Sequence, residues 1–375
     1  MRMRRAVLLA GIALLAAPIA RSGHEQPVYP SYYPHEIEIA AIAPERAAEL
    51  MRAGKLQAYL GELPTSGEGE KAIAAAQSLG SLLVVRLAPG SALAADPAEA
   101  CAVTAAIARS MEGRGGFVLH PYPVTPFHGD YLHHADRAEA ASERLRAAPP
   151  PRQEPRVRAE GALARSLLPA AWRTESAAWD AKVEEVSAAR LLAESTVVLN
   201  GWLGPRWVRF GWYHAWRALA LAADPARSEA VDALARRLMA VDYETPLTAI
   251  ELERALVEGL ASDCRAMVVG YTVRREHYSA AFTSGIENLA VDALEGLSSP
   301  MFLRTVKLKD FPWNGWLQLG LAAAPAAAWS PVGGFDDAFG RLLWYAVGDP
   351  AAIPSPYEAT WTLNRISEVE AAPAR

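Results

Sequence analysis

Four of the eight histidines of the chain lie within one short segment, HPYPVTPFHGDYLHHAD, which begins at residue 120. Its potential metal ligands are His120, His128, His133 and His134, with Asp130 and Asp136 among them. Imidazole and carboxylate groups are the usual ligands of Zn, Cu and Fe ions outside thiolate sites, and three of them with an open position make a reactive centre. We therefore expect a metal site here, formed by two loop histidines, His120 and His128, and by His133 or His134 from the following helix.

The same histidines have two other interpretations. They could line a polar cleft that holds no ion, or they could be structural, with Asp130 capping the helix that follows. If the chain is an enzyme, Asp130 is the candidate general base beside the metal. The spacing of the histidines matches none of the common metal-binding motifs, so the metal hypothesis depends on residue type and position.

A second cluster, NGWLGPRWVRFGWYHAW, runs from residue 200 to 216 and interleaves aromatic with basic side chains. Exposed aromatic rings stack on sugars or flat ligands, and guanidinium groups suit an anionic substituent. The candidate ligand-binding residues are Tyr122, Trp207, Arg209, Trp212 and His214. Trp212 and Trp216 also have the spacing of a packed helix face, so burial in the core or between lobes is the alternative.

The elements that would position the histidine-rich loop alternate between strands and helices. We expect strands at 35–42, 56–61, 81–87 and 115–120, and helices at 44–54, 70–80, 96–111 and 130–147. Strands separated by helices imply crossover connections, which predict an α/β lobe with a mainly parallel sheet. The loop follows the fourth strand, and ligands gather at the carboxyl ends of the strands in such sheets.

The proline-rich segment 148–156 predicts a linker between an α/β domain at 25–147 and a second domain at 157–375. All 11 tryptophans lie in the second domain. Its pattern predicts helices at 212–222, 228–240 and 250–261 and strands at 266–273 and 301–309. We therefore expect a mostly helical α+β lobe.

The first residues, MRMRR, are basic, and an uncharged apolar run from Ala6 to Ala20 follows. This order predicts a signal peptide at residues 1–22 and a periplasmic or secreted protein without a membrane span after cleavage. The run is shorter than the about 20 residues of a spanning helix, so an uncleaved anchor is the weaker alternative. The two cysteines, Cys101 and Cys264, could form one disulfide or remain two buried thiols.

The charge balance, 37 basic against 42 acidic residues, does not indicate a partner such as nucleic acid or an anionic membrane. The sequence contains no GxSxG, P-loop, HExxH, CxxCH or dinucleotide-binding motif. The exported α/β lobe, with AGKLQAYLG after its first helix, resembles two-lobed periplasmic solute-binding proteins in architecture. The tryptophan-rich second half departs from that pattern.

The leading functional hypothesis is a soluble periplasmic ligand- or metal-binding or accessory protein with its site at the histidine-rich loop. A metal-dependent extracytoplasmic enzyme that uses the same histidines is the first alternative. The second is an envelope protein-interaction factor that anchors its partner through exposed tryptophans.

Overall fold

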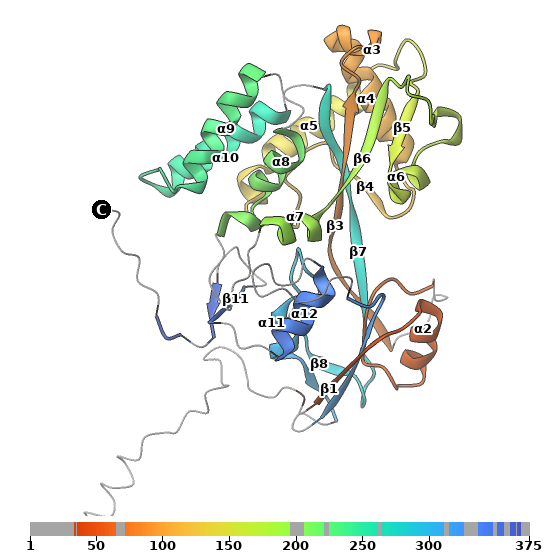
Figure 1. Cartoon of the computed structure of the whole chain (residues 1–375), viewed down its shortest axis with the longest axis vertical. Coiled ribbons are helices and arrows are strands. Elements are labelled where there is room, and N and C mark those ends of the chain that lie inside the picture. Colours follow the sequence, from red (N-terminus) through yellow and green to blue (C-terminus); the bar gives the residue numbers. More distant parts are fainter. Residues whose placement is uncertain are drawn as a thin grey trace, which may run out of the picture.

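Eight strands form one mixed sheet at the centre of the described part of the chain (Figure 1). Along the sheet lie β1 (Glu36–Ala41), β10 (Trp316–Leu321), β2 (Ala58–Leu60), β7 (Ala266–Ser279), β3 (Ile73–Leu87), β6 (Ala181–Ser187) and β5 (Val157–Glu160), and β4 (Phe117–Leu119) pairs with β7 outside this order. The structure is a computed structural model, and it describes residues 34, 36–64, 72–195, 206–220, 225–261, 264–310, 315–325, 337–347, 351–355, 361–364 and 366–368. The predicted signal peptide lies outside these residues.

The pairing of the strands corrects the expectation of a mainly parallel sheet. Neighbours β1–β10, β10–β2 and β5–β6 are parallel, whereas β2–β7, β3–β7, β3–β6 and β4–β7 are antiparallel. Among the described residues, β1 to β4 pair with β6, β7 and β10 and never with one another. The sheet therefore draws strands from both sides of the proline-rich segment 148–156.

The central strand β3 is longer than the sequence predicts. Segment 70–80 was expected to be a helix because alanine favours helices, but from Ile73 onward it is the first half of β3. It pairs antiparallel with β7 from Ile73 opposite Ser279 to Leu79 opposite Val273. Hydrogen bonding along this whole ladder overrides the local helix propensity, so the helix prediction is wrong here.

The strand predicted at 81–87 is present as the second half of β3, and it is covered on both faces. Leu82 and Val84 pack into one apolar cluster, whereas Leu83 and Val85 pack into another on the opposite face. This alternation follows from the two-residue period of side chains along a strand. Helices therefore cover both faces of the sheet at this point.

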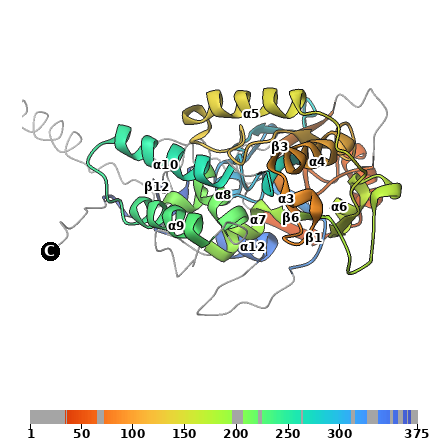
Figure 2. The ribbon, with the colours of Figure 1, turned by 90° about the horizontal axis from the view of Figure 1, so that it is seen from above.

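Eleven α-helices are present among the described residues, and they pack on both faces of the sheet. They are α2 (Pro44–Arg52), α3 (Ala92–Ala95), α4 (Pro97–Met111), α5 (Ala135–Ala147), α6 (Ala162–Leu167), α7 (Ala188–Ser195), α8 (Gly211–Leu219), α9 (Pro225–Met239), α10 (Pro246–Ala261), α11 (Pro300–Thr305) and α12 (Ala338–Val347). Residues of α4 and α6 belong to the apolar cluster that contains Leu83, and residues of α7 to α10 belong to the cluster that contains Leu82. Both views show α9 and α10 side by side, projecting from the sheet (Figures 1 and 2). No helix among the described residues is long and apolar enough to span a membrane.

Most predicted helices are present, and one predicted strand is not. The helix predicted at 96–111 is α4, and Asp96 caps it because its side chain accepts a hydrogen bond from the amide of Ala98 at 3.0 Å. The segment predicted as a strand at 301–309 is instead α11 and the short strand β9 (Lys307–Leu308). Ser299 caps this helix and Pro300 begins it, a start signal that outweighs the alternating pattern of the segment. The remaining strands, β8 (Ile286–Asn288), β11 (Ala352–Pro354) and β12 (Trp361–Leu363), form two small sheets, β8 with β9 and β11 with β12.

The two cysteines form a disulfide. Cys101 lies on α4 and Cys264 lies two residues before β7, and their Cα atoms are 4.9 Å apart. The bond joins segments that are 163 residues apart in the chain. Of the two alternatives for the cysteines, the bridged one is therefore present.

Candidate functional site

The histidine-rich loop packs against the start of α8. It follows β4, passes through the short 3-10 helix η1 (Tyr131–His133) and continues into α5. Within it Asp130 is buried, and its carboxylate accepts hydrogen bonds from the amides of Gly211 at 2.8 Å and Trp212 at 3.2 Å. Asp130 therefore caps α8 rather than the helix that follows it in sequence. Burial raises the pKa of Asp130, although these hydrogen bonds favour the charged form.

His128 and His214 form a hydrogen-bonded pair in the core. His128 Nδ1 accepts from the amide of Thr125 at 2.9 Å, so its proton lies on Nε2, which donates to His214 Nδ1 at 2.9 Å. His214 Nε2 then donates to the carbonyl of Val208 at 2.9 Å. Burial lowers the pKa of both rings, that of His214 to about 4. Because all four ring nitrogens have partners, neither side chain offers a lone pair to an ion in this arrangement.

His120 and His134 lie apart from that pair. His120 Nε2 donates to the carbonyl of Val124 at 3.0 Å. His134 is fully buried, and its Nδ1 lies 3.0 Å from the hydroxyl of Tyr122. Burial and the charge of Arg254 lower the pKa of His134 to about 4, which keeps the ring neutral at pH 7.

His133 contacts a carboxylate from outside the histidine-rich segment, at a position that was not among the predicted site residues. Its Nδ1 lies 3.2 Å from Oε2 of Glu253, which belongs to α10 and is buried. Burial and the nearby charge of Asp130 raise the pKa of Glu253 to about 7. Arg254, the next residue, forms an ion pair with Asp136 and donates to the carbonyl of His133, so α10 is held against the loop.

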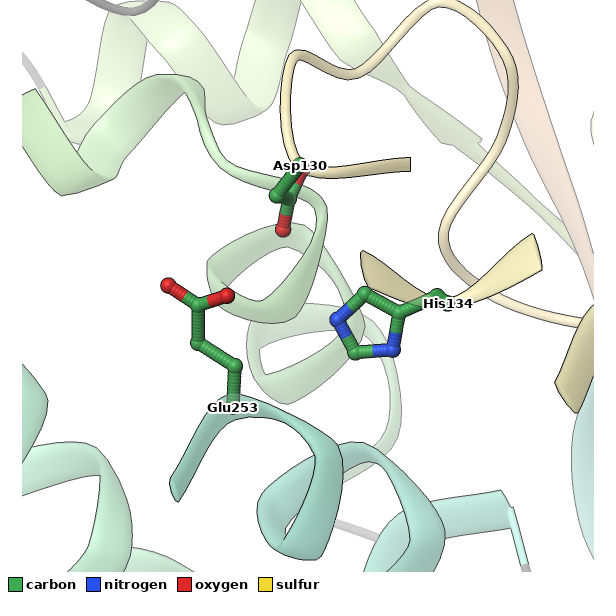
Figure 3. Close-up of side chains that lie close together, drawn as sticks. All are labelled: Asp130, His134 and Glu253. Atoms are coloured by element: carbon green, nitrogen blue, oxygen red, sulfur yellow. The ribbon is translucent and has the colours of Figure 1, made fainter. Parts of the chain in front are cut away.

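One trio of potential ligands meets in space. Asp130, His134 and Glu253 each offer one atom, and these atoms lie within 4.8 Å of one another (Figure 3). It is the only such group of three or more His, Cys, Asp or Glu side chains in the described part of the chain. The expected combination of His120 and His128 with His133 or His134 is therefore not brought together, and of the four candidate histidines only His134 belongs to the trio.

A sequence signal for Glu253 does exist. Leu256, Val257 and Leu260 follow it at helical spacing, and all three are buried in the core. A carboxylate at the start of an apolar helix stripe is unusual, because burying it without a partner is unfavourable. The pattern indicates that Glu253 is a buried carboxylate that needs a partner, but it does not indicate which residues it contacts.

The candidate ligand-binding residues, which are Tyr122 and four residues of the aromatic and basic cluster at 200–216, are largely enclosed. Trp212 and Tyr122 belong to the main apolar cluster, and Trp207 packs against it. Arg209 forms ion pairs with Asp292 and, at 3.0 Å, with Glu295. In this structure these side chains contribute to the core and to a buried ion cluster.

A pocket of about 600 Å³ lies between β6 and the helices α7 and α8. Six charged side chains line it: Arg86, Arg190, Arg217, Glu160, Glu184 and Glu185. Its volume falls within the range of about 300–1,000 Å³ that is typical of small-molecule sites. None of the histidines discussed above is among its lining residues.

Two of the charged side chains that line this pocket, Arg86 of β3 and Glu184 of β6, form an ion pair with each other. Arg86 Nε donates to Glu184 at 2.6 Å, and its Nη2 donates to the carbonyl of Ala218. Burial works against the charged form of Glu184, but hydrogen bonds from Lys182 and Arg86 outweigh it and lower the pKa. Nη1 of Arg86 is buried and has no hydrogen-bond partner among the described residues, so it is a donor that lacks an acceptor.

No protein-family model matches the sequence, and no curated protein sequence matches it either. Several solved structures are similar at low level. The oligopeptide-binding protein AppA from Bacillus subtilis, solved with a nonapeptide, shares 11% identity at a TM-score of 0.38, over 71% of this chain and 59% of its own. The periplasmic binding protein DppA from Helicobacter pylori, an ABC transporter-associated protein solved with a peptide, shares 13% identity at a TM-score of 0.39, over 70% of this chain and 54% of its own. This chain spans less than two thirds of either protein, and TM-scores of this size assign it no ligand.

Proposed function

We propose that this chain is an exported protein that binds a small charged solute in the pocket between β6, α7 and α8. The observation that carries the proposal is a cavity of about 600 Å³ whose lining includes three arginines and three glutamates. Charged side chains that converge on a concave surface are the groups that orient a charged ligand and give a site its specificity.

Two features support export. The basic and apolar order of residues 1–22 is that of a signal peptide. The disulfide between Cys101 and Cys264 suits an oxidising compartment, since bridges of this kind do not persist in most cytosolic proteins. Together they favour the periplasm or the extracellular medium as the place of action.

The lining charges favour a solute that carries both signs. Carboxylate groups of a ligand would pair with the arginines, and a ligand oxygen that reached Arg86 Nη1 would satisfy that buried donor. An ammonium group would pair with a glutamate such as Glu185, whose Oε1 accepts from Ser81 at 2.7 Å. Amino acids and short peptides have this combination of groups.

The pocket is tested by ligand-dependent thermal stability and tryptophan emission. Mature protein is screened against amino acids, dipeptides and tripeptides, with neutral sugars and polyamines as comparison classes. A zwitterion that binds only the folded state raises the melting temperature, and a change of tryptophan emission on its addition is the second readout.

A matched pair of variants locates the binding. Arg190 and Arg217 are exposed at the pocket, so Arg190→Gln with Arg217→Gln should weaken zwitterion binding and leave the fold intact. Arg236→Gln, on the exposed side of α9, is the control and should bind as the wild type does. If no class of compound stabilises the wild type, or if the double variant binds unchanged, the pocket is not the site.

A further inference from the structure

The trio Asp130, His134 and Glu253 contains a buried imidazole nitrogen that has no partner. His134 has no exposed surface, and its Nε2 forms no hydrogen bond with any described residue. Figure 3 shows the imidazole ring of His134 directed at the two carboxylates. A buried polar atom without a partner destabilises a fold by about 1–3 kcal/mol, so its persistence calls for an explanation.

The opposite edge of the same ring is held in place. The hydroxyl of Tyr122 lies 3.0 Å from Nδ1, within hydrogen-bonding distance. If Nδ1 carries the proton and donates it to Tyr122, the lone pair of Nε2 points at Asp130 and Glu253. Metal-binding histidines have this arrangement, because the bond from the second ring nitrogen sets the tautomer and the ring orientation.

Each carboxylate of the trio retains capacity to bind a cation. Asp130 uses one lone pair on each oxygen for the amides of α8, and a carboxylate offers about four such positions. Glu253 contacts His133 through Oε2. Two carboxylates buried this close together repel each other, and a cation between them would remove that repulsion.

We propose that Asp130, His134 and Glu253 bind one divalent first-row transition-metal ion, with Zn²⁺ the ion that this donor set suits. One imidazole and two carboxylates without a thiolate are ligands that Zn²⁺ accepts, and three protein ligands leave a coordination position open. His133, which contacts Glu253, is a positioning residue: it orients the carboxylate and is itself partly exposed. The site differs from the solute pocket, so it extends the proposed function and does not depend on it.

Binding would draw the trio together. Ligand atoms around a tetrahedral Zn²⁺ at about 2.1 Å are about 3.4 Å apart. The three atoms lie within 4.8 Å of one another, so no separation has to shorten by more than about 1.4 Å. Rotation of Glu253, the longest of the three side chains, is the simplest way to close this distance.

The test titrates chelator-treated, untagged mature protein with Zn²⁺ alone and measures heat and melting temperature. We expect one ion per chain and a rise in melting temperature, because the ion binds only the folded state. His134→Asn removes Nε2 but keeps a polar atom for Tyr122, and Glu253→Gln removes the charge but keeps the shape. Each should weaken Zn²⁺ binding by more than about 100-fold, since even second-shell changes weaken it by about 10–100-fold.

Two controls make the result decisive. His120→Gln alters a histidine of the same loop that lies outside the trio and should bind Zn²⁺ like the wild type. A crystal of wild-type protein soaked in Zn²⁺ should show anomalous scattering between the three side chains, which needs no variant to fold. Absence of Zn²⁺ binding, equal affinity in His134→Asn and Glu253→Gln, or scattering elsewhere would overturn the proposal. The Arg190→Gln and Arg217→Gln protein should keep its Zn²⁺ affinity, so failure of the solute pocket would not affect this result.

Discussion

At the scale of single residues, the pair formed by His128 and His214 makes stability depend on pH. The two rings form a hydrogen-bond chain that begins at the amide of Thr125 and ends at the carbonyl of Val208. Each ring accepts at Nδ1 and donates from Nε2, so both rings must be neutral. The pKa of His214 is about 4 in the folded protein, against about 6.5 in an unfolded chain. The unfolded state therefore binds more protons between these values, and the free energy of unfolding falls as the pH is lowered through that range.

The prediction is measured by comparison with His214→Gln, which cannot titrate. The shift of His214 corresponds to about 3 kcal/mol, so the stability advantage of the wild type should shrink by about that amount between pH 7 and pH 4. A comparison is needed because Glu253, whose pKa is raised to about 7, acts with the opposite sign over part of this range. Urea unfolding of metal-free protein at several pH values gives the numbers. A constant difference between the two proteins would contradict the predicted role of His214.

Arg209, expected from the sequence to bind a ligand, has a different effect that can be measured. It is buried between Asp292 and Glu295, and Asp292 has no exposed surface. Arg209→Met should lower the free energy of unfolding by about 3–5 kcal/mol, because it leaves buried carboxylates without a counter-charge. Adding Asp292→Asn should recover part of this loss in urea unfolding. A loss of solute binding with unchanged stability would instead support the ligand-binding interpretation.

At the scale of elements, the contact between the histidine-rich loop and α8 depends on Gly211. A Cβ atom at this position would lie 2.5 Å from Cγ1 of Val124 and 3.1 Å from Cγ of His128. Gly211→Ala should therefore destabilise the protein by about 1–3 kcal/mol through overpacking. At Gly90 an added Cβ meets nothing within 4 Å, so Gly90→Ala is the matched control and should change stability by less than about 0.5 kcal/mol. Equal urea midpoints for the two variants would show that the loop can move away from α8.

At the scale of the whole molecule, the central sheet contains strands from both the N-terminal and the C-terminal half of the chain. Strands β1 to β4 find their partners in β6, β7 and β10, all of which follow the proline-rich segment 148–156. A fragment comprising residues 25–147 should therefore lack a cooperative unfolding transition, because its edges and apolar faces would be left without partners. Circular dichroism during heating checks this prediction. A fragment that melts cooperatively would instead support the sequence-based expectation of an independent α/β domain at 25–147.

Much of the local structure follows from short stretches of sequence. The helix at 96–111 begins at an Asp-Pro pair whose side chain caps it, and the strand at 81–87 is apolar along both faces. Helix capping and hydrophobic periodicity depend on residues that are close together in the chain, so they can be recognised from the sequence alone. The crowding of histidines after β4 is equally visible. The expectation that Asp130 caps the helix that follows it is wrong, because its carboxylate binds the first amides of α8.

The local sequence pattern does not determine which distant segments of the chain a strand, helix or side chain will contact. The alanine-rich start of β3 is a strand only because β7 pairs with it, Ile73 opposite Ser279. Glu253 meets Asp130 and His134 only because α10 packs against the loop, and Cys101 reaches Cys264 across 163 residues. Such contacts depend on the strand register and on the packing free energy of the whole core. The helix or strand propensity of any one segment contributes little to that free energy. The histidine-rich loop is thus evident in the sequence, whereas the identity of the potential ligands that meet there was decided by the tertiary structure.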